Sequence, residues 1–197
     1  NAIMYGSILV GLDEWQGQED EIVKSTSRTL ANAKKYNADQ IGYDGVGVGS
    51  GVGSILNTME FRRHYDFTAQ AKVVFPDKYY NHVAKITNKD MFKSLKDQAW
   101  WNLADRFRNT HNAITNGEKF TADQMISISS DINKDLLYTV INELSTPLRD
   151  FDSAGRVVVE SKPDLKKRGI NSPNVADAVV IASARSLLVR KSILDNL

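Results

Sequence analysis

An aspartate followed by a run of glycines is the first feature of this sequence that could carry chemistry. Asp44 ends a short strand-like run over 40–43 and is followed by Gly45, Gly47 and Gly49, and the five glycines between positions 45 and 53 are all odd-numbered. The dinucleotide fingerprint and the P-loop both need glycines five positions apart, a spacing that odd positions cannot give, so neither motif is present. A carboxylate here would repel a bare phosphate but could hold a metal ion, and backbone without side chains would let a phosphodiester approach. An ordinary Asp–Gly turn explains the local sequence equally well.

A second carboxylate, Asp177, interrupts an apolar helix face. Ser172 and Pro173 are typical of a helix start, and an apolar run predicts a helix that continues to Val189. The other positions on the face of Asp177 are Pro173, Val180, Ile181, Ala184 and Leu188. An ionised carboxylate is costly to bury unpaired, so Asp177 needs a cationic partner or a metal ion, although the helix N-terminus relieves part of that cost. A salt-bridged aspartate at the edge of the core is the alternative.

A basic segment lies just before this helix. It contains Lys162, Lys166, Lys167 and Arg168 with a single acid, Asp164, in a chain whose formal net charge is only +1. Cations beside a carboxylate site would suit cleavage of a polyanion, because they hold the phosphate backbone while metal ions neutralise the reacting phosphate. A solvated, lysine-rich turn is the simpler alternative.

Periodicity and turn residues predict the elements that must position these side chains. We expect strands or hairpins over 3–12, 40–44, 72–75, 125–128 and 147–160, and helices over 19–36, from the glycines to 59, over 88–110, 134–144 and 173–189. Strands followed by mixed helices favour an α/β or α+β fold with a mixed sheet.

Composition excludes several functional classes. The 197 residues are 42 % hydrophobic and 25 % charged, which is typical of a globular domain and not of a disordered chain. There is no cysteine, and the three histidines lack helical ligand spacing, so no zinc site is expected. No segment approaches a membrane span and no secretory signal is present, so we expect no membrane partner and a cytoplasmic location.

Several segments, in order along almost the whole chain, resemble one family. They lie at 12–15, 43–49, 88–90, 96–101, 162–169 and 172–178, and the Asp–Gly motif and the Ser-Pro-Asn-x-Ala-Asp-Ala segment are the most specific. The family is the C-terminal nuclease domain of the tailed-phage terminase large subunit, the DNA-packaging motor protein. The resemblance implies a single RNase H-like α/β domain over 1–197, with a central mixed β-sheet flanked by helices and an additional β-hairpin near 147–160.

The resemblance also implies a site and an activity. The family is a metal-dependent endonuclease that cleaves double-stranded viral DNA concatemers during genome packaging with two Mg²⁺ or Mn²⁺ ions, and its second and last catalytic carboxylates correspond to Asp44 and Asp177. The basic residues from Lys162 to Arg168 would then bind DNA, and Gly45, Gly47 and Gly49 would let the substrate approach the backbone.

The same resemblance implies partners and a missing part. The portal protein and the terminase small subunit are the expected partners, the host cytoplasm is the expected location, and ATP would serve only an ATPase domain that precedes this one. The first catalytic aspartate is expected on a central strand before Asn1, because Asp13 and Glu14 match the end of a later strand. The alternatives are a non-catalytic DNA-binding or portal-docking module, and another RNase H-like nuclease of the resolvase or transposase type.

Overall fold

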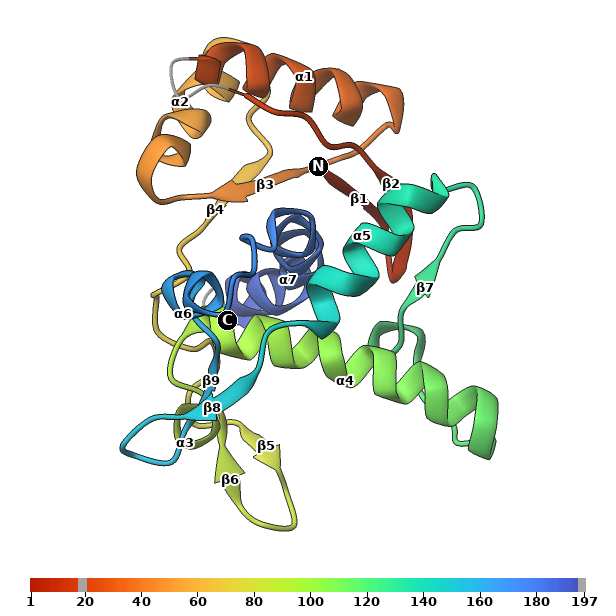
Figure 1. The fold of residues 1–197 in the computed structure, drawn as a ribbon, viewed down its shortest axis with the longest axis vertical. Coiled ribbons are helices and arrows are strands. Elements are labelled where there is room, and N and C mark those ends of the chain that lie inside the picture. The colour runs from red at the N-terminus through yellow and green to blue at the C-terminus, as the bar shows by residue number, and fades with distance from the viewer. Residues whose placement is uncertain (18–20, 195–197) are drawn as a thin grey trace.

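The strands of the fold form two small sheets and two hairpins. The computed structural model describes residues 1–17 and 21–194. In one sheet β1 (Ala2–Tyr5) is antiparallel to β2 (Ile8–Leu12), and β2 is parallel to β7 (Ser127–Ile128). In the other, β3 (Ile41–Asp44) is parallel to β4 (His64–Phe67). The hairpins are β5 (Tyr79–Asn81) with β6 (Ile86–Thr87), and β8 (Arg149–Phe151) with β9 (Val157–Val159), both far from α1 in Figure 1.

Helices connect and cover these sheets. They are α1 (Ile22–Lys35), η2 (Gly47–Gly51), α2 (Val52–Thr58), α3 (Asn88–Met91), α4 (Leu95–Asn116), η3 (Ala122–Gln124), α5 (Lys134–Ser145), α6 (Lys162–Lys167) and α7 (Asn174–Leu194). α7 is central, because it packs against α4, α5, β1 and β3 (Figure 1). Its residues Ala176, Val179 and Val180 are at most 1 % exposed and join the largest apolar core.

Most of the predicted elements are confirmed. The hairpin over 3–12, the strand that ends at Asp44, the helices of 134–144 and 173–189, and the hairpin of 147–160 all appear with small shifts of their ends. The helix expected over 19–36 is confirmed as α1 from Ile22, and its first two expected residues lie outside the described residues. The last helix begins at Asn174, and the carbonyl oxygen of Pro173 accepts its first backbone hydrogen bond, from Asp177 N at 2.8 Å. The mixed α/β architecture agrees with the expected RNase H-like class.

The strand expected over 72–75 is wrong. The peptide groups of Val74 are satisfied by a side chain and not by a neighbouring strand: Val74 N donates to Gln98 Oε1 at 2.8 Å, and Gln98 Nε2 donates to Val74 O at 3.0 Å. Phe75 then turns the chain with a φ of 50°. The neighbouring strand of the sheet is instead β4, which the sequence analysis missed because its residues are mostly polar.

The single helix expected over 88–110 is also wrong, because the chain is extended at Phe92 and Ser94 between α3 and α4. Ser94 caps α4, and its hydroxyl donates to Asp97 Oδ2 at 2.6 Å. The other carboxylate oxygen of Asp97, which is 3 % exposed, accepts from Val159 N at 2.8 Å. Asp97 thereby fixes β9 against the start of α4, and so it positions α6, which follows β9 directly.

Candidate metal site

Asp44 lies at the carboxyl end of β3, where the sequence places it. It is exposed, and its Oδ1 accepts a hydrogen bond from Val46 N at 3.1 Å. This short Asx turn uses one lone pair of the carboxylate and leaves the others open to a ligand.

The three glycines after Asp44 each have a structural reason in the fold. A Cβ on Gly49 would lie 1.9 Å from the carbonyl oxygen of Asp44, and one on Gly45 would lie 3.0 Å from Cβ of Asp66. Gly47 has a φ of +62°, a conformation that favours glycine, with open space around it. The run therefore allows η2 to fold back tightly on the end of β3, and it leaves bare backbone next to Asp44.

Asp177 lies in the first turn of α7, with its side chain 24 % exposed. Asp177 and Asp44 are 133 residues apart in the chain, and both line the same cavity of about 1590 Å³. The α7–β3 packing brings the two elements together. The two carboxylates singled out from the sequence therefore border the same cavity.

Lys162 is the cationic partner of Asp177. Its Nζ lies 2.8 Å from Asp177 Oδ2, and it lines the same cavity. α6 places it there, because Ser161 caps the helix and Lys162 is its first residue. Lys162 is therefore the cationic partner that an aspartate on an apolar helix face requires, and it holds a carboxylate oxygen of Asp177 that a metal ion would otherwise bind.

The other three basic residues of the segment do not line this cavity. Lys167 pairs with Asp164 at 2.7 Å within α6, and Arg168 pairs with Glu160. Within the described part of the chain, Lys166 makes no ion pair and is exposed. The segment forms the helix α6 and not the lysine-rich turn considered as the alternative, but only Lys162 of its basic residues lines the cavity.

Two charged residues near Asp177 were missed by the sequence analysis. Glu143 of α5 accepts from Ala176 N at 2.9 Å, so it caps the start of α7. Burial is the main cause that raises the pKa of Glu143, and the nearby charges of Glu14 and Asp177 also raise it. Lys96 donates to the carbonyl oxygen of Glu160 at 3.2 Å, and burial lowers its pKa although Asp177 opposes that shift. No periodicity marks either residue, because each acts on an element distant in sequence.

Comparison with known proteins identifies the fold. The sequence matches no protein-family model and no curated protein. Among solved structures, the nuclease domain of the large terminase subunit gp2 of bacterial virus Sf6 matches with a TM-score of 0.80 and 27 % identity over 92 % of this chain and 80 % of that chain. The chain has the fold of a terminase nuclease domain. The family resemblance read from the sequence is thereby confirmed.

Two further structures of that terminase nuclease domain carry metal ions. A mutant of it with manganese and a mutant with calcium each match with a TM-score of 0.80 and 26 % identity over 92 % of this chain, and over 81 % and 80 % of their own lengths.

The oxygen donors in this terminase nuclease fold suit a hard cation, but the described residues supply few of them. Asp44 and Asp177 offer oxygen ligands, which favour Mg²⁺ or Mn²⁺ over zinc. Over residues 1–17 and 21–194, however, no group of three or more histidine or acidic side chains is close enough to hold a metal ion.

The same residues contain no helix long and apolar enough to cross a membrane.

Proposed function

We propose that this chain is a metal-dependent endonuclease domain that cleaves double-stranded viral DNA concatemers during genome packaging. The observation that carries the proposal is the convergence of Asp44 and Asp177 on one cavity in a fold shared with the Sf6 nuclease domain. The metals in the structures of that domain support a divalent ion, and we propose two Mg²⁺ or Mn²⁺ ions for this chain. Two such ions would activate a water molecule and stabilise the leaving oxygen.

The chain's own residues would divide the remaining work. Asp44 and Asp177 would act as ligands, and Lys162 would leave Asp177 when the carboxylate turns to a metal ion, so its charge would become available to a phosphate. Gly45, Gly47 and Gly49 would keep side chains away from the substrate next to Asp44. Lys166, Lys167 and Arg168 on α6 would contact the DNA backbone further out, where contacts carry no sequence information.

We propose that a third carboxylate completes the site. Two aspartates and a lysine leave one net negative charge, too little to balance two divalent ions, and the described residues contain no group of three acidic or histidine side chains that could hold a metal ion. The first catalytic aspartate expected before Asn1 would supply it. In the packaging motor, acting in the host cytoplasm, the portal protein and the terminase small subunit would be the partners, and ATP would serve the preceding ATPase domain.

Substitution of the two aspartates tests the proposed activity. In the full-length protein, Asp44→Asn and Asp177→Asn are each expected to reduce Mn²⁺-dependent plasmid cleavage by about 100-fold or more, since a metal ligand contributes several kcal/mol to the transition state. Asp131→Asn, which changes an exposed carboxylate outside the cavity, is the matched control and is expected to cut at the wild-type rate.

The second candidate is a non-catalytic DNA-binding or portal-docking module. The absence, among the described residues, of a group of three or more acidic or histidine side chains that could hold a metal ion favours it. Wild-type protein that binds DNA but does not cut it with Mg²⁺ or Mn²⁺ would establish that candidate and reject the nuclease.

A further inference from the structure

The segment over 72–93, which we call the basic lobe, concentrates positive charge. It contains five lysines and two aspartates, a formal charge of +3, in a chain whose formal net charge is only +1, so the rest of the chain is net acidic. None of its residues, all of which the structure describes, lines the cavity that Asp44 and Asp177 share. The metal site proposed for these two aspartates therefore does not account for the charge of the lobe.

Most of the positive charge of the basic lobe is not neutralised by its own acids. Asp77 forms an ion pair with Lys89 at 2.7 Å, and Asp90 accepts a hydrogen bond from the hydroxyl of Thr87. The remaining four lysines are exposed and form no ion pair within the described part of the chain: Lys72, Lys78, Lys85 and Lys93. Four such lysines in one short segment make a surface that is complementary in charge to a polyanion.

Buried and half-buried polar contacts hold the basic lobe in place. Asn88 is 8 % exposed, and its Nδ2 donates to the carbonyl oxygens of Val74 at 3.2 Å and Phe75 at 2.9 Å. In the β5–β6 hairpin, the hydroxyl of Tyr80 donates to Asp105 Oδ2 of α4 at 2.9 Å. The backbone that carries the lysines is therefore already ordered, which lowers the entropy cost of binding a ligand.

The basic lobe adjoins the basic residues of α6. Lys93 N donates to the carbonyl oxygen of Val157 in β9 at 3.3 Å. In the first turn of α4, Lys96 Nζ donates to the carbonyl oxygen of Glu160, which lies between β9 and α6, at 3.2 Å. Both hairpins lie at the end of the molecule away from α1 (Figure 1). Positive charge is therefore continuous from the lobe, through Lys96, to α6.

We propose that the basic lobe is a second contact surface for the phosphate backbone of double-stranded DNA, next to α6 and outside the metal site. The choice of duplex DNA as the polyanion rests on the proposed function. The shape of the lobe agrees with it, because a two-stranded ribbon such as the β5–β6 hairpin is narrow enough to enter the major groove of B-DNA. Lys78 and Lys85 of the hairpin contact phosphates on one part of the duplex, and Lys72 and Lys93 contact phosphates nearer to α6.

Two double variants of the full-length protein test this surface. Lys78→Ala with Lys85→Asn removes the charges of the hairpin, and Lys72→Ala with Lys93→Ala removes those nearer to α6. Asparagine is chosen at position 85 because the φ of 54° there is a left-handed conformation that asparagine tolerates. Each pair should make the salt dependence of duplex binding shallower by about 1.8 in log–log slope, since each lost phosphate contact removes about 0.9. Binding is measured without divalent metal ions, so failure of this proposal is distinct from failure of the nuclease proposal.

Removal of the same amount of charge elsewhere is the matched control. Lys34→Ala with Lys35→Ala removes two exposed lysines from the last turn of α1, away from the lobe (Figure 1), and should leave the salt dependence at its wild-type slope. A wild-type slope for either lobe pair, an equal change in the α1 control, or a loss confined to one DNA sequence would each overturn the proposal. Weaker binding of polyglutamate with unchanged DNA binding would also overturn it, because the lobe would then serve an acidic protein partner.

Discussion

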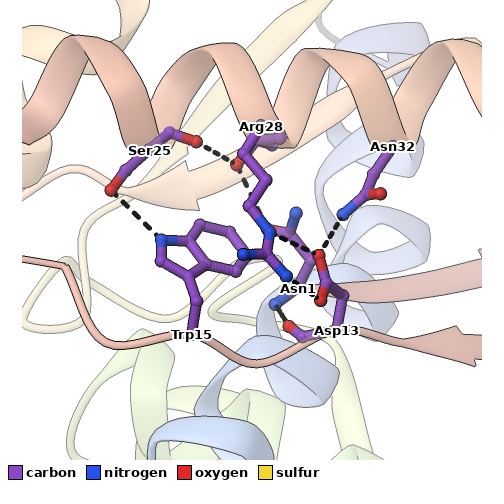
Figure 2. A network of polar contacts seen from close by, with 7 residues as sticks. Asn1, Asp13, Trp15, Ser25, Arg28 and Asn32 are labelled. Atoms are coloured by element: carbon purple, nitrogen blue, oxygen red, sulfur yellow. Dashed lines mark hydrogen bonds and ion pairs between the residues drawn. The ribbon is translucent and has the colours of Figure 1, made fainter.

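The two acidic regions of the molecule use their carboxylates in opposite ways. Figure 2 shows Asp13, just after β2, surrounded by donors: Arg28 Nε at 2.9 Å, Arg28 Nη2 at 2.6 Å and Asn32 Nδ2 at 2.6 Å. The guanidinium of Arg28 also stacks 4.6 Å above the ring of Trp15, whose Nε1 donates to Ser25. Asp44, in contrast, accepts one backbone hydrogen bond, and Asp177 has one lysine.

The difference separates a structural carboxylate from an available one. The hydrogen bond from Arg28 is the main reason that the pKa of Asp13 is lowered, so its charge is already committed to joining β2 to α1. The carboxylates of the cavity keep free lone pairs and can change partners. An acid near a strand end is therefore a ligand candidate only where the fold has left its oxygens without fixed donors.

The largest expected effect is on metal affinity. Asp44→Asn and Asp177→Asn should each weaken Mn²⁺ binding to the full-length protein by at least about 100-fold, because loss of a mere supporting residue already costs 10–100-fold. Asp13→Asn should leave Mn²⁺ affinity unchanged in the same calorimetric titration. Equal losses for Asp13 and Asp177 would remove the distinction between the two regions.

A second effect concerns the most deeply buried structural carboxylate. Asp97→Ala should lower the free energy of unfolding by about 2 kcal/mol, because it leaves Val159 N buried without an acceptor and releases β9 from α4. Urea unfolding measures the loss. Asp90→Ala, which changes an exposed carboxylate in the neighbouring α3, is the control, and a similar loss in both variants would contradict the role given to Asp97.

The Asp13 network should appear in the pH dependence of stability. Because the folded state lowers the pKa of Asp13, its contribution is complete above the unfolded pKa of about 3.9 and is lost as pH falls through the lower folded value. Asp13→Asn should therefore cost about 1–2 kcal/mol at pH 7 and flatten the stability profile in the acid range. Thermal unfolding of the wild type and the variant between pH 2 and about 7 checks the sign, and parallel profiles would show that Arg28 does not stabilise the ionised form.

The smallest expected effect distinguishes two adjacent lysines of α6. Lys166, with no ion pair in the described chain, should contact phosphate, so Lys166→Ala should make the salt dependence of DNA binding shallower by about 0.9 in log–log slope. Lys167→Ala should change the slope less, because Asp164 already neutralises Lys167. Binding at several salt concentrations measures both, and a loss confined to one DNA sequence would mean that these side chains read bases.

Local sequence patterns were enough to predict Asp44 and Asp177 as candidate metal ligands, because each is an unusual residue type for its position. Asp44 ends a strand and is followed by glycines, and Asp177 lies on an apolar helix face. Both features can be recognised from a few neighbouring residues. The salt bridge between Lys162 and Asp177 could not be predicted from the sequence, although both residues were singled out. It depends on the buried contact of Asp97 with β9, which positions α6 next to α7.

The missed elements have similar long-range causes. Val74 lies in an apolar run that is typical of a strand, but the side chain of Gln98 takes both of its peptide groups and leaves none for a ladder. In the sequence, Glu143 looks like any other polar residue of an amphipathic helix. Its role as the acceptor of an N-terminal peptide N–H of α7 is visible only in the folded structure. Such choices are made by packing partners that lie more than 20 residues away.

The contact between Gly49 and the carbonyl oxygen of Asp44 ties the mutability of the glycine run to the geometry of the site. A methyl group at position 49 cannot be accommodated 1.9 Å from that oxygen, so even alanine must push the end of β3 aside. Gly47 has no such neighbour and is constrained only by its backbone angle. The two positions therefore tolerate substitution differently. Position 49 is expected to stay glycine as long as Asp44 must keep its place, while asparagine is an acceptable replacement at position 47.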